Sequence, residues 1–372
     1  MKKKVLITGS NGFVGKNLVI FLTHAFPDFY EINKASRETS DENLRNMILS
    51  SDVIVHLAGE NRPKNERDFR VGNVNYLEKI CEIAANRKIP IISNSSTQVE
   101  CSNSYGSSKL AGEALLKLYH QNTGSAVSIF RFPNIFGKWC KPNYNSFIAT
   151  MCHNIWRDIP INIDNKEKII RLVYIDDVVR SITEEIKSIV CSDHLKYLEV
   201  NPVYDKSLGE IFEKLIALKN SQFNFEIQER AVGFDRALAA TFMSYCPKEK
   251  IKYPLKEYSD TRGSFYEVLR QGSHGQVSIS TTRPGVTRGN HFHYSKQERF
   301  LVLQGVCLFD FRSLNTGERV TFSTSSSLKE MVEVPLGFTH NFTNIGEDEL
   351  VVLIWCNEEF DRNKPDTYFL EV

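Results

Sequence analysis

Three histidines and one glutamate in the last quarter of the chain have the types and spacing of a metal site. His291 and His293 are two residues apart, and a β-strand projects residues i and i+2 to the same face. Glu298 follows five residues later, and His340 comes from a separate stretch, "PLGFTHNFTN". Three imidazoles and a carboxylate suit a divalent transition metal such as zinc, manganese or iron. The pattern therefore predicts that these four residues bind such a metal.

A glycine-rich turn near residue 10 has the pattern of a dinucleotide site. In "VLITGSNGFVG", Gly9, Gly12 and Gly15 follow a β-branched run and open an amphipathic stretch. Such a turn lets the backbone approach a pyrophosphate, and the helix N-terminus offers N–H groups and a positive dipole end. The cofactor-binding residues that we predict in this turn are Gly9, Asn11, Gly12, Phe13, Val14 and Gly15.

The residues after the second predicted strand indicate which dinucleotide is bound. "FYEIN" is followed by Lys34, Ser36 and Arg37. At this place a carboxylate holds a ribose 2′-hydroxyl, whereas a cation holds a 2′-phosphate. Two cations and a hydroxyl favour NADPH, although two exposed surface charges account for the same pattern.

A tyrosine and a lysine in "YGSSK" have the spacing of a proton-transfer pair. Tyr105 and Lys109 are four residues apart and share a face if the segment is a helix. We expect the ammonium to lower the pKa of the phenol, which makes Tyr105 a usable proton donor near neutral pH. Ser96, at the end of a predicted strand, is placed to hydrogen-bond the same substrate carbonyl. The alternative is an ordinary helix face.

The first 180 residues alternate strand and helix patterns, which predicts a parallel, doubly wound α/β sheet. The predicted strands are 4–8, 52–59, 89–96 and 125–137, and the predicted helices are 15–26, 74–87 and 107–124. A further amphipathic helix is predicted at 207–221.

Beyond residue 246 the pattern changes to short alternating strands with Gly and Pro turns, such as 275–281, 299–313 and 349–356. This pattern of short strands and turns predicts a small all-β barrel or sandwich. We therefore predict two domains, 1–246 and 247–372. A length of 372 residues also favours two cores over one.

Composition excludes several classes of partner. With 46 Lys+Arg and 45 Asp+Glu, no charge excess favours nucleic acid or an anionic membrane. The apolar run after "MKKK" is too short for a signal peptide, and no run spans a bilayer. The eight cysteines show no metal or disulfide spacing. We expect a cytoplasmic protein with small-molecule partners.

The first part of the chain resembles the extended short-chain dehydrogenase/reductases, a Rossmann-fold family. The similar stretches are "TGSNGFVG", "DVIVHLAG", "NVNYL", "YGSSK", "RFPNIFG" and "RLVYIDDVV". The resemblance implies that Ser96, Tyr105 and Lys109 are catalytic and that Lys109 also holds the nicotinamide ribose. It further implies cofactor contacts at Leu57, Ala58 and Gly59, and substrate contacts at Asn73, Asn134 and Arg171. "TQVEC" replaces the stretch that usually carries a substrate-side tyrosine.

The last part resembles the cupins, which are jelly-roll barrels. The first cupin motif is matched at Gly285, His291, His293, Glu298 and Gly305; the second is matched at Pro335, Gly337, His340 and Asn344, with Lys329 in place of its leading glycine. "DTRGSFYE" and "TRGNHFH" are also similar to sugar-nucleotide 3,5-epimerases, which implies substrate contacts at Arg262 and Arg288. In those enzymes a histidine is the base. Here the matching His291 is assigned to the metal, so Tyr294 and Lys296 are the remaining candidates for the base.

The combination of both parts resembles the CapF-like bifunctional capsular polysaccharide enzymes. The resemblance implies a zinc-containing homodimer that acts on a UDP-linked 4-keto amino sugar in UDP-N-acetyl-L-fucosamine synthesis. Its cupin domain would invert C3, and its first domain would reduce C4 with NADPH. Two alternatives stay open. One is a 4-epimerase or dehydratase with tightly held NAD, and the other is a 4-ketoreductase whose cupin is a sugar-nucleotide sensor or dimerisation module.

Overall fold

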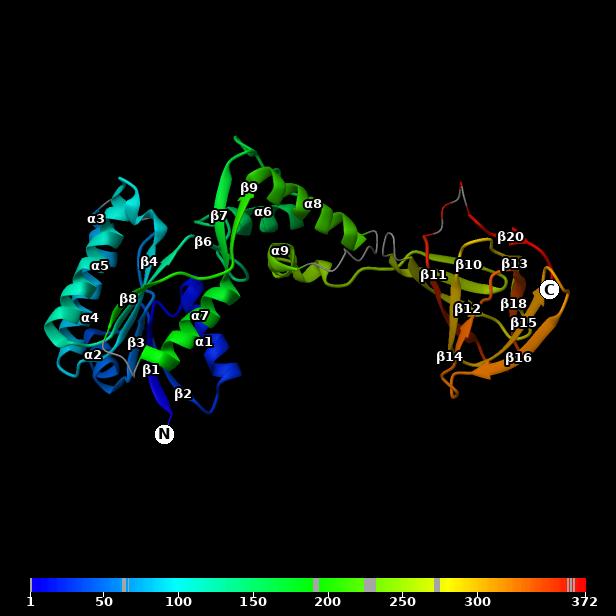
Figure 1. Cartoon of the computed structure of the whole chain (residues 1–372), viewed down its shortest axis with the longest axis horizontal. Helices are drawn as coiled ribbons and strands as arrows, with labels where there is room; N and C mark the ends of the chain where they lie inside the picture. The colour runs from blue at the N-terminus through cyan, green and yellow to red at the C-terminus, as the bar shows by residue number, and fades with distance from the viewer. Residues whose placement is uncertain are drawn as a thin grey trace. The chain divides into compact units, whose positions relative to one another are not determined.

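The computed structural model describes residues 2–61, 65, 67–189, 194–223, 232–270, 275–359, 361, 363 and 365–372. Two compact units form (Figure 1). One contains the chain up to Ile216 and Val232–Pro247, and the other contains Lys248–Val372 with the stretch that begins at Ala217. We retain 246/247 as the proposed domain boundary.

The first unit is built on a six-stranded parallel sheet. Its β-branched runs pair side by side because each strand is followed by a helix that returns the chain to the same edge. Across the sheet the strands are β2 (Tyr30–Ala35), β1 (Lys3–Thr8), β3 (Val53–His56), β4 (Ile91–Ser96), β5 (Val127–Phe132) and β8 (Leu195–Leu198). The chain order reverses between β1 and β3, and ligands of such sheets bind at the carboxyl ends of the strands at this reversal.

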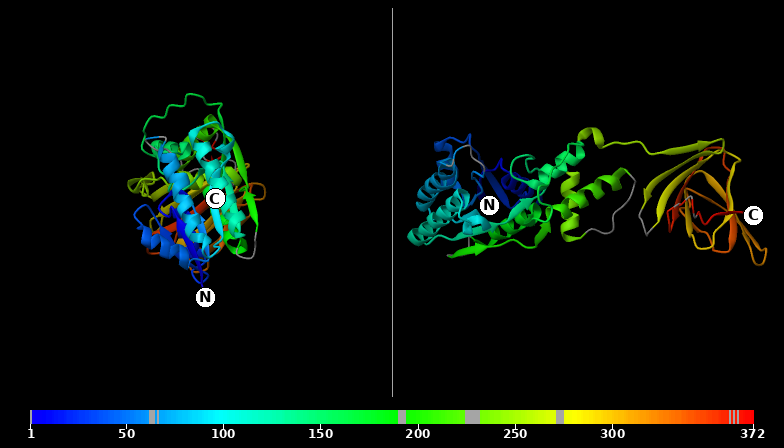
Figure 2. Two further views of the ribbon diagram at one scale, coloured as in Figure 1. Left: turned by 90° about the vertical axis from the view of Figure 1, so that its left-hand side faces the viewer. Right: turned by 90° about the horizontal axis from the view of Figure 1, so that it is seen from above.

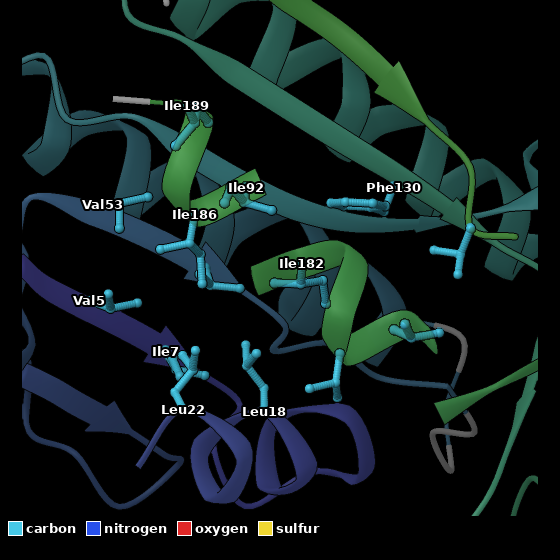
Figure 3. Packing of buried hydrophobic residues seen from close by; sticks show 14 of the residues in the cluster. Val5, Ile7, Leu18, Leu22, Val53, Ile92, Phe130, Ile182, Ile186 and Ile189 are labelled. Carbon is cyan, nitrogen blue, oxygen red and sulfur yellow. The ribbon is translucent and has the colours of Figure 1, made fainter. Parts of the chain in front are cut away.

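Helices cover both faces of this sheet. Along β1, Val5 and Ile7 pack against α1 (Phe13–Ala25) and α7 (Ile175–Ser188), as Figure 3 shows. Leu6, between them, packs on the opposite face, because successive strand residues alternate in direction. That face is covered by α2 (Asp41–Ser50), α4 (Tyr76–Ala85) and α5 (Ser104–Thr123).

Smaller elements complete the first unit. A second sheet joins β6 (Asn134–Phe136), β7 (Ile169–Tyr174) and β9 (Val203–Ser207). The remaining helices are α3 (Arg67–Arg70), α6 (Phe147–Trp156), α9 (Gly233–Met243) and the part of α8 (Leu208–Phe223) that ends at Ile216, with a π-helical turn at Val71–Asn75. The views in Figure 2 show how the helices lie along the sheet.

The second unit consists of two antiparallel sheets that face each other across an apolar core. One sheet has the order β10 (Glu257–Asp260), β11 (Gly263–Arg270), β12 (Gln276–Thr282), β19 (Leu350–Cys356), β14 (Glu298–Gln304) and β17 (Met331–Glu333). The other has the order β16 (Arg319–Ser325), β15 (Val306–Ser313), β18 (Phe338–Asn344), β13 (Thr287–Phe292) and β20 (Tyr368–Phe369). Phenylalanines from both sheets, including Phe300 and Phe309, fill the core.

The predicted fold class is confirmed. A Rossmann-like α/β domain precedes an all-β domain of the cupin type. Among the described residues, no helix combines the length and apolarity that crossing a bilayer requires.

Candidate active site and metal centre

The glycine turn packs so tightly that side chains would not fit. Gly9 has φ +64°, and a Cβ there would lie 2.7 Å from the backbone nitrogen of Ala58. A Cβ on Gly15 would lie 2.2 Å from the Gly9 carbonyl oxygen. Helix α1 begins at Phe13 with no side-chain cap, which leaves its N-terminus suited to an anion such as a pyrophosphate.

A cleft of about 840 Å³ runs from this turn to the carboxyl ends of β4 and β5. The predicted cofactor residues on its wall are Asn11, Gly12, Phe13, Val14, Gly15, Arg37, Leu57 and Gly59. Gly9 and Ala58 pack against each other behind the turn. Lys34 is an exposed residue of β2, and the Ser36 hydroxyl accepts a hydrogen bond from the Glu38 N–H at 3.3 Å.

Arg37 is held by a carboxylate that the sequence did not single out. Its guanidinium pairs with Glu60, and the Tyr144 hydroxyl donates to Glu60 Oε1 at 3.4 Å. The Glu60 backbone is fixed in turn, because its N–H donates to Asn73 Oδ1 at 2.7 Å. Arg37 therefore has an anionic partner at the place where a 2′-phosphate would bind.

Ser96, Tyr105 and Lys109 come together at the end of β4 and the start of α5. Asn103 caps this helix by accepting a hydrogen bond from the Gly106 N–H at 2.7 Å, and Tyr105 lies in the first turn. Ser96 hydrogen-bonds with Tyr105, and both line the cleft. The Lys109 ammonium lies 6.0 Å from the centre of the Tyr105 ring and donates to the Asn94 carbonyl oxygen at 3.4 Å.

The expected effect of Lys109 on Tyr105 is wrong for this arrangement. Burial raises the pKa of Tyr105, and the opposing influence is the hydrogen bond with Ser96. The charge of Lys109 does not offset this rise. Burial instead lowers the pKa of Lys109 itself to about 8, against the opposing charge of Glu113. Ser96 is thus the direct partner of the phenol.

Glu113 anchors a buried network behind Lys109. Its carboxylate accepts a hydrogen bond from the Ser95 hydroxyl at 2.5 Å and a bidentate pair from Arg131 at 3.0 and 2.6 Å. A cavity of about 10 Å³, the size of one water molecule, is lined by Lys109, Glu113 and His56. Burial lowers the pKa of His56 to about 3, so this imidazole is neutral. Glu113 was missed although it follows Lys109 by one helical turn.

The three predicted substrate residues of the first unit have different surroundings. Asn73 is buried, and its amide donates to Ser108 Oγ and to the Glu60 carbonyl oxygen, both at 3.0 Å. Its side chain therefore ties the Gly59–Glu60 loop to α5. Asn134 lines the cleft and donates to the carbonyl oxygen of Arg171, which is an exposed residue of β7.

In the second unit, all four predicted metal ligands converge. One ligand atom from each of His291, His293, Glu298 and His340 lies within 4.8 Å of the others. The Nε2 atoms of His293 and His340 each lie 3.2 Å from Glu298 Oε2, and that of His291 lies 3.9 Å from it. Strands β13, β14 and β18 thus supply a compact N₃O donor set, which suits zinc and similar divalent metals.

The protonation pattern of His293 fits a bound cation. Its Nδ1 lies 2.5 Å from the Asp366 carbonyl oxygen, which can only accept, so Nδ1 carries the proton. Nε2 then presents a lone pair, is buried without a hydrogen-bond partner, and faces the Glu298 oxygen. A nitrogen lone pair and a carboxylate oxygen 3.2 Å apart call for a shared cation, which is either a metal ion or a second imidazole proton. The residues present therefore fit a metal.

Two more side chains approach the other carboxylate oxygen of Glu298. The Lys296 ammonium lies 3.7 Å from Oε1, and the Cys356 thiol lies 3.5 Å from the same atom. Lys296 is buried, whereas Tyr294 is 70% exposed and contacts the ring of Tyr368. Of the two candidate bases, the structure brings Lys296 to the cluster.

A β-bulge brings Arg288 to the same face as the histidines. Strand β13 pairs with β18 as Arg288↔Phe342 and His291↔His340, with a register shift between Gly289 and His291. Phe342 and His340 are two residues apart and share a face, so their partners Arg288 and His291 share one too. Simple alternation along the sequence would have placed them on opposite faces.

The two predicted arginines of the second unit lie at different distances from the carboxylate of Asp260. Arg262 Nε and NH2 both donate to Asp260 Oδ2, at 3.0 and 2.6 Å, whereas Arg288 NH2 lies 3.9 Å from Oδ1. Arg288 Nε and NH2 are buried without a hydrogen-bond partner among the described residues. Burial and the charge of Arg262 lower the pKa of Arg288. An anionic ligand would satisfy this guanidinium.

Two protein families match the two units. Residues 5–190 match the NAD dependent epimerase/dehydratase family, and residues 258–368 match the polysaccharide biosynthesis C-terminal domain.

Known relatives extend over the whole chain. It is 44% identical over 371 residues, 99% of both chains, to the UDP-2-acetamido-2,6-beta-L-arabino-hexul-4-ose reductase of Pseudomonas aeruginosa. The crystal structure of the capsular polysaccharide assembling protein CapF from Staphylococcus aureus has a TM-score of 0.91 and 41% identity, and the match covers 99% of this chain and 100% of that one. The NAD complex of UDP-glucuronic acid 4-epimerase from Bacillus cereus shares the fold alone, with a TM-score of 0.55 and 17% identity over 65% of this chain and 98% of that one.

Proposed function

The chain belongs to the NAD dependent epimerase/dehydratase family, and we propose that it is a bifunctional enzyme acting on one UDP-linked 4-keto sugar. The resemblance to CapF-like enzymes is confirmed along 99% of the chain. Its cupin domain epimerises C3 of UDP-2-acetamido-2,6-dideoxy-4-hexulose. Its Rossmann domain reduces C4 to give UDP-2-acetamido-2,6-dideoxy-L-talose, in UDP-N-acetyl-L-fucosamine synthesis. The observation that carries the proposal is the presence of a Ser-Tyr-Lys set and a His₃Glu cluster in one chain.

For the reduction, a nicotinamide cofactor held in the cleft would supply the hydride that C4 receives. Ser96 and Tyr105 hydrogen-bond the ketone oxygen, and Tyr105 gives it a proton, so that the ketone becomes an alcohol. Lys109, whose ammonium lies over the Tyr105 ring, would hold the nicotinamide ribose. We propose that the cofactor is NADPH and that Arg37 leaves Glu60 to hold its 2′-phosphate.

For the epimerisation, the C4 carbonyl acidifies the C3 proton of the same sugar. A divalent metal, which we propose is zinc, would act as a Lewis acid toward a substrate oxygen. His291, His293, Glu298 and His340 would hold it. Arg288, with unsatisfied N–H groups on the same face as His291, binds an anionic group of the nucleotide sugar. Removal of the C3 proton by a base, for which Lys296 is the candidate nearest the cluster, and delivery of a proton to the opposite face would invert C3.

The proposal is tested by incubating the protein with the UDP-linked 4-keto sugar and NADPH. We expect NADPH to be consumed in proportion to the sugar and the product to carry an inverted C3 and a C4 hydroxyl by NMR. Tyr105→Phe should stop NADPH consumption. Co-purifying NAD with no net consumption of NADPH would instead support a 4-epimerase. The homodimer and the cytoplasmic location are part of the same proposal, and sedimentation tests the dimer.

A further inference from the structure

The carboxylate of Asp366 binds the loop between two metal-ligand strands. Its Oδ1 accepts a hydrogen bond from the Tyr294 N–H at 3.0 Å. Its Oδ2 accepts from the N–H groups of Ser295 and Lys296 and from the Ser295 hydroxyl, all at 2.9 Å. Four donors thus converge on one side chain, and these bonds hold its pKa well below the usual range although burial opposes them.

The same residue touches a metal ligand through its backbone. The Asp366 carbonyl oxygen accepts the proton of His293 Nδ1 at 2.5 Å. His293 is 3% exposed and directly precedes the loop that the carboxylate binds. Asp366 also has φ +36°, a left-handed conformation that is uncommon for non-glycine residues but that aspartate adopts more readily than most. Asp366 therefore contacts both the 294–296 loop, through its carboxylate, and the His293 imidazole, through its backbone carbonyl.

The segment that carries Asp366 has other attachments, which do not depend on its side chain. Strand β20 pairs with β13 at His291↔Phe369, and the Leu370 N–H donates to the Asn290 carbonyl oxygen at 2.9 Å. Arg319 NH2 donates to the carbonyl oxygen of Val372 at 3.0 Å. Removing the Asp366 carboxylate is therefore expected to loosen the 294–296 loop while β20 stays paired.

We propose that Asp366 is the positioning residue of the metal centre, because it fixes His293 with Nδ1 protonated and Nε2 facing the metal. The proposal rests on the metal site proposed above. A histidine ligand needs its other nitrogen bound to an acceptor, and loss of such a partner lowers metal affinity by about 10–100-fold. In the described structure, the Asp366 carbonyl is that acceptor and its own carboxylate keeps it in place.

The test compares Asp366→Ala and Asp366→Asn with the wild type and with Asp361→Ala. Asp361 lies in the same segment and accepts the Asn363 N–H at 2.8 Å, so its removal disturbs a local turn as a matched control. The dissociation constant for Zn²⁺ is measured on the full-length protein by competition with a chromophoric chelator. Asp366→Ala keeps the backbone carbonyl and removes only the carboxylate that fixes the loop, so we expect a rise toward the lower end of that range, about tenfold, a smaller rise for Asp366→Asn, and a change within about twofold for Asp361→Ala.

Two further readouts separate positioning from general damage. Imidazole ¹⁵N NMR of the zinc-loaded wild type should show His293 protonated at Nδ1, and Asp366→Ala should show mixed states. NADPH-dependent reduction by the Rossmann domain monitors the fold. Unchanged zinc affinity in both Asp366 variants would overturn the inference. A wild type that binds no Zn²⁺ would overturn the proposed metal site instead.

Discussion

Replacing Glu113 by glutamine is expected to lower the pH at which ketone reduction fails. Burial lowers the pKa of Lys109 to about 8, and the charge of Glu113 opposes that fall. In the proposed reaction Lys109 acts as a cation, so activity should be present below this pKa and should be lost as the pH rises through it. Without the Glu113 charge, the loss should begin at a lower pH.

The size of the shift follows from the charges around Lys109. An opposite charge within about 4–6 Å changes a pKa by roughly 1–3 units. Glutamine keeps the shape of Glu113 but leaves Arg131, now 2.6 Å from the carboxylate, without its anion. A fall of about one unit takes the charged fraction of Lys109 at about pH 7.5 from roughly three quarters to one quarter. We therefore expect kcat/KM to be about threefold lower at that pH and equal to wild type near pH 6.

The assay is the pH dependence of kcat/KM for NADPH oxidation with the UDP-linked 4-keto sugar. Glu185→Gln is the matched control, because Glu185 is also a buried helix carboxylate that accepts from a serine, Ser128, and pairs with a cation, Lys196. It lies on α7, and its loss should affect thermal unfolding without moving the pH profile. A Glu113→Gln profile that coincides with wild type would refute an electrostatic role for Glu113.

Two further substitutions test the cofactor cleft and the cupin face. Glu60→Gln removes the carboxylate that pairs with Arg37 and so frees Arg37 to bind a 2′-phosphate. The KM for NADPH should fall by up to about fivefold, because an exposed ion pair contributes at most about 1 kcal/mol. An equal fall in the KM for NADH would show that the effect is not on the 2′-phosphate. Arg288→Met removes a buried guanidinium whose Nε and NH2 have no hydrogen-bond partner among the described residues. The melting temperature should therefore rise by about 2–4 °C, while the KM of the sugar nucleotide for C3 exchange should increase. A lower melting temperature with an unchanged KM would contradict this reasoning.

The elements and the main residue clusters could be predicted because their signals are local. Strand and helix periodicity predicted the fold class, and the spacing of His291, His293 and Glu298 predicted that these side chains would converge as a candidate metal site. The bulge at Asn290 could not be predicted, because it depends on pairing with β18 and reverses the face on which Arg288 lies. Asp366 was missed because its role comes from contacts with residues about seventy positions earlier in the chain.

The pair of Tyr105 and Lys109 shows a different limit. Helical spacing correctly placed both residues on one helix. It could not show how deeply the phenol is buried, and this burial raises the pKa of Tyr105 instead of lowering it. The same reasoning could have identified Glu113, because it lies one helical turn after Lys109 on α5.

The division of the two reactions between the domains is tested by deuterium exchange in D₂O without NADPH. The UDP-linked 4-keto sugar is followed by NMR at C3, with the wild type and with His291→Ala. We predict that the wild type incorporates deuterium at C3 and that His291→Ala does not. NADPH oxidation by the wild type with no deuterium at C3 would contradict the proposal and leave a 4-ketoreductase whose cupin domain has another role.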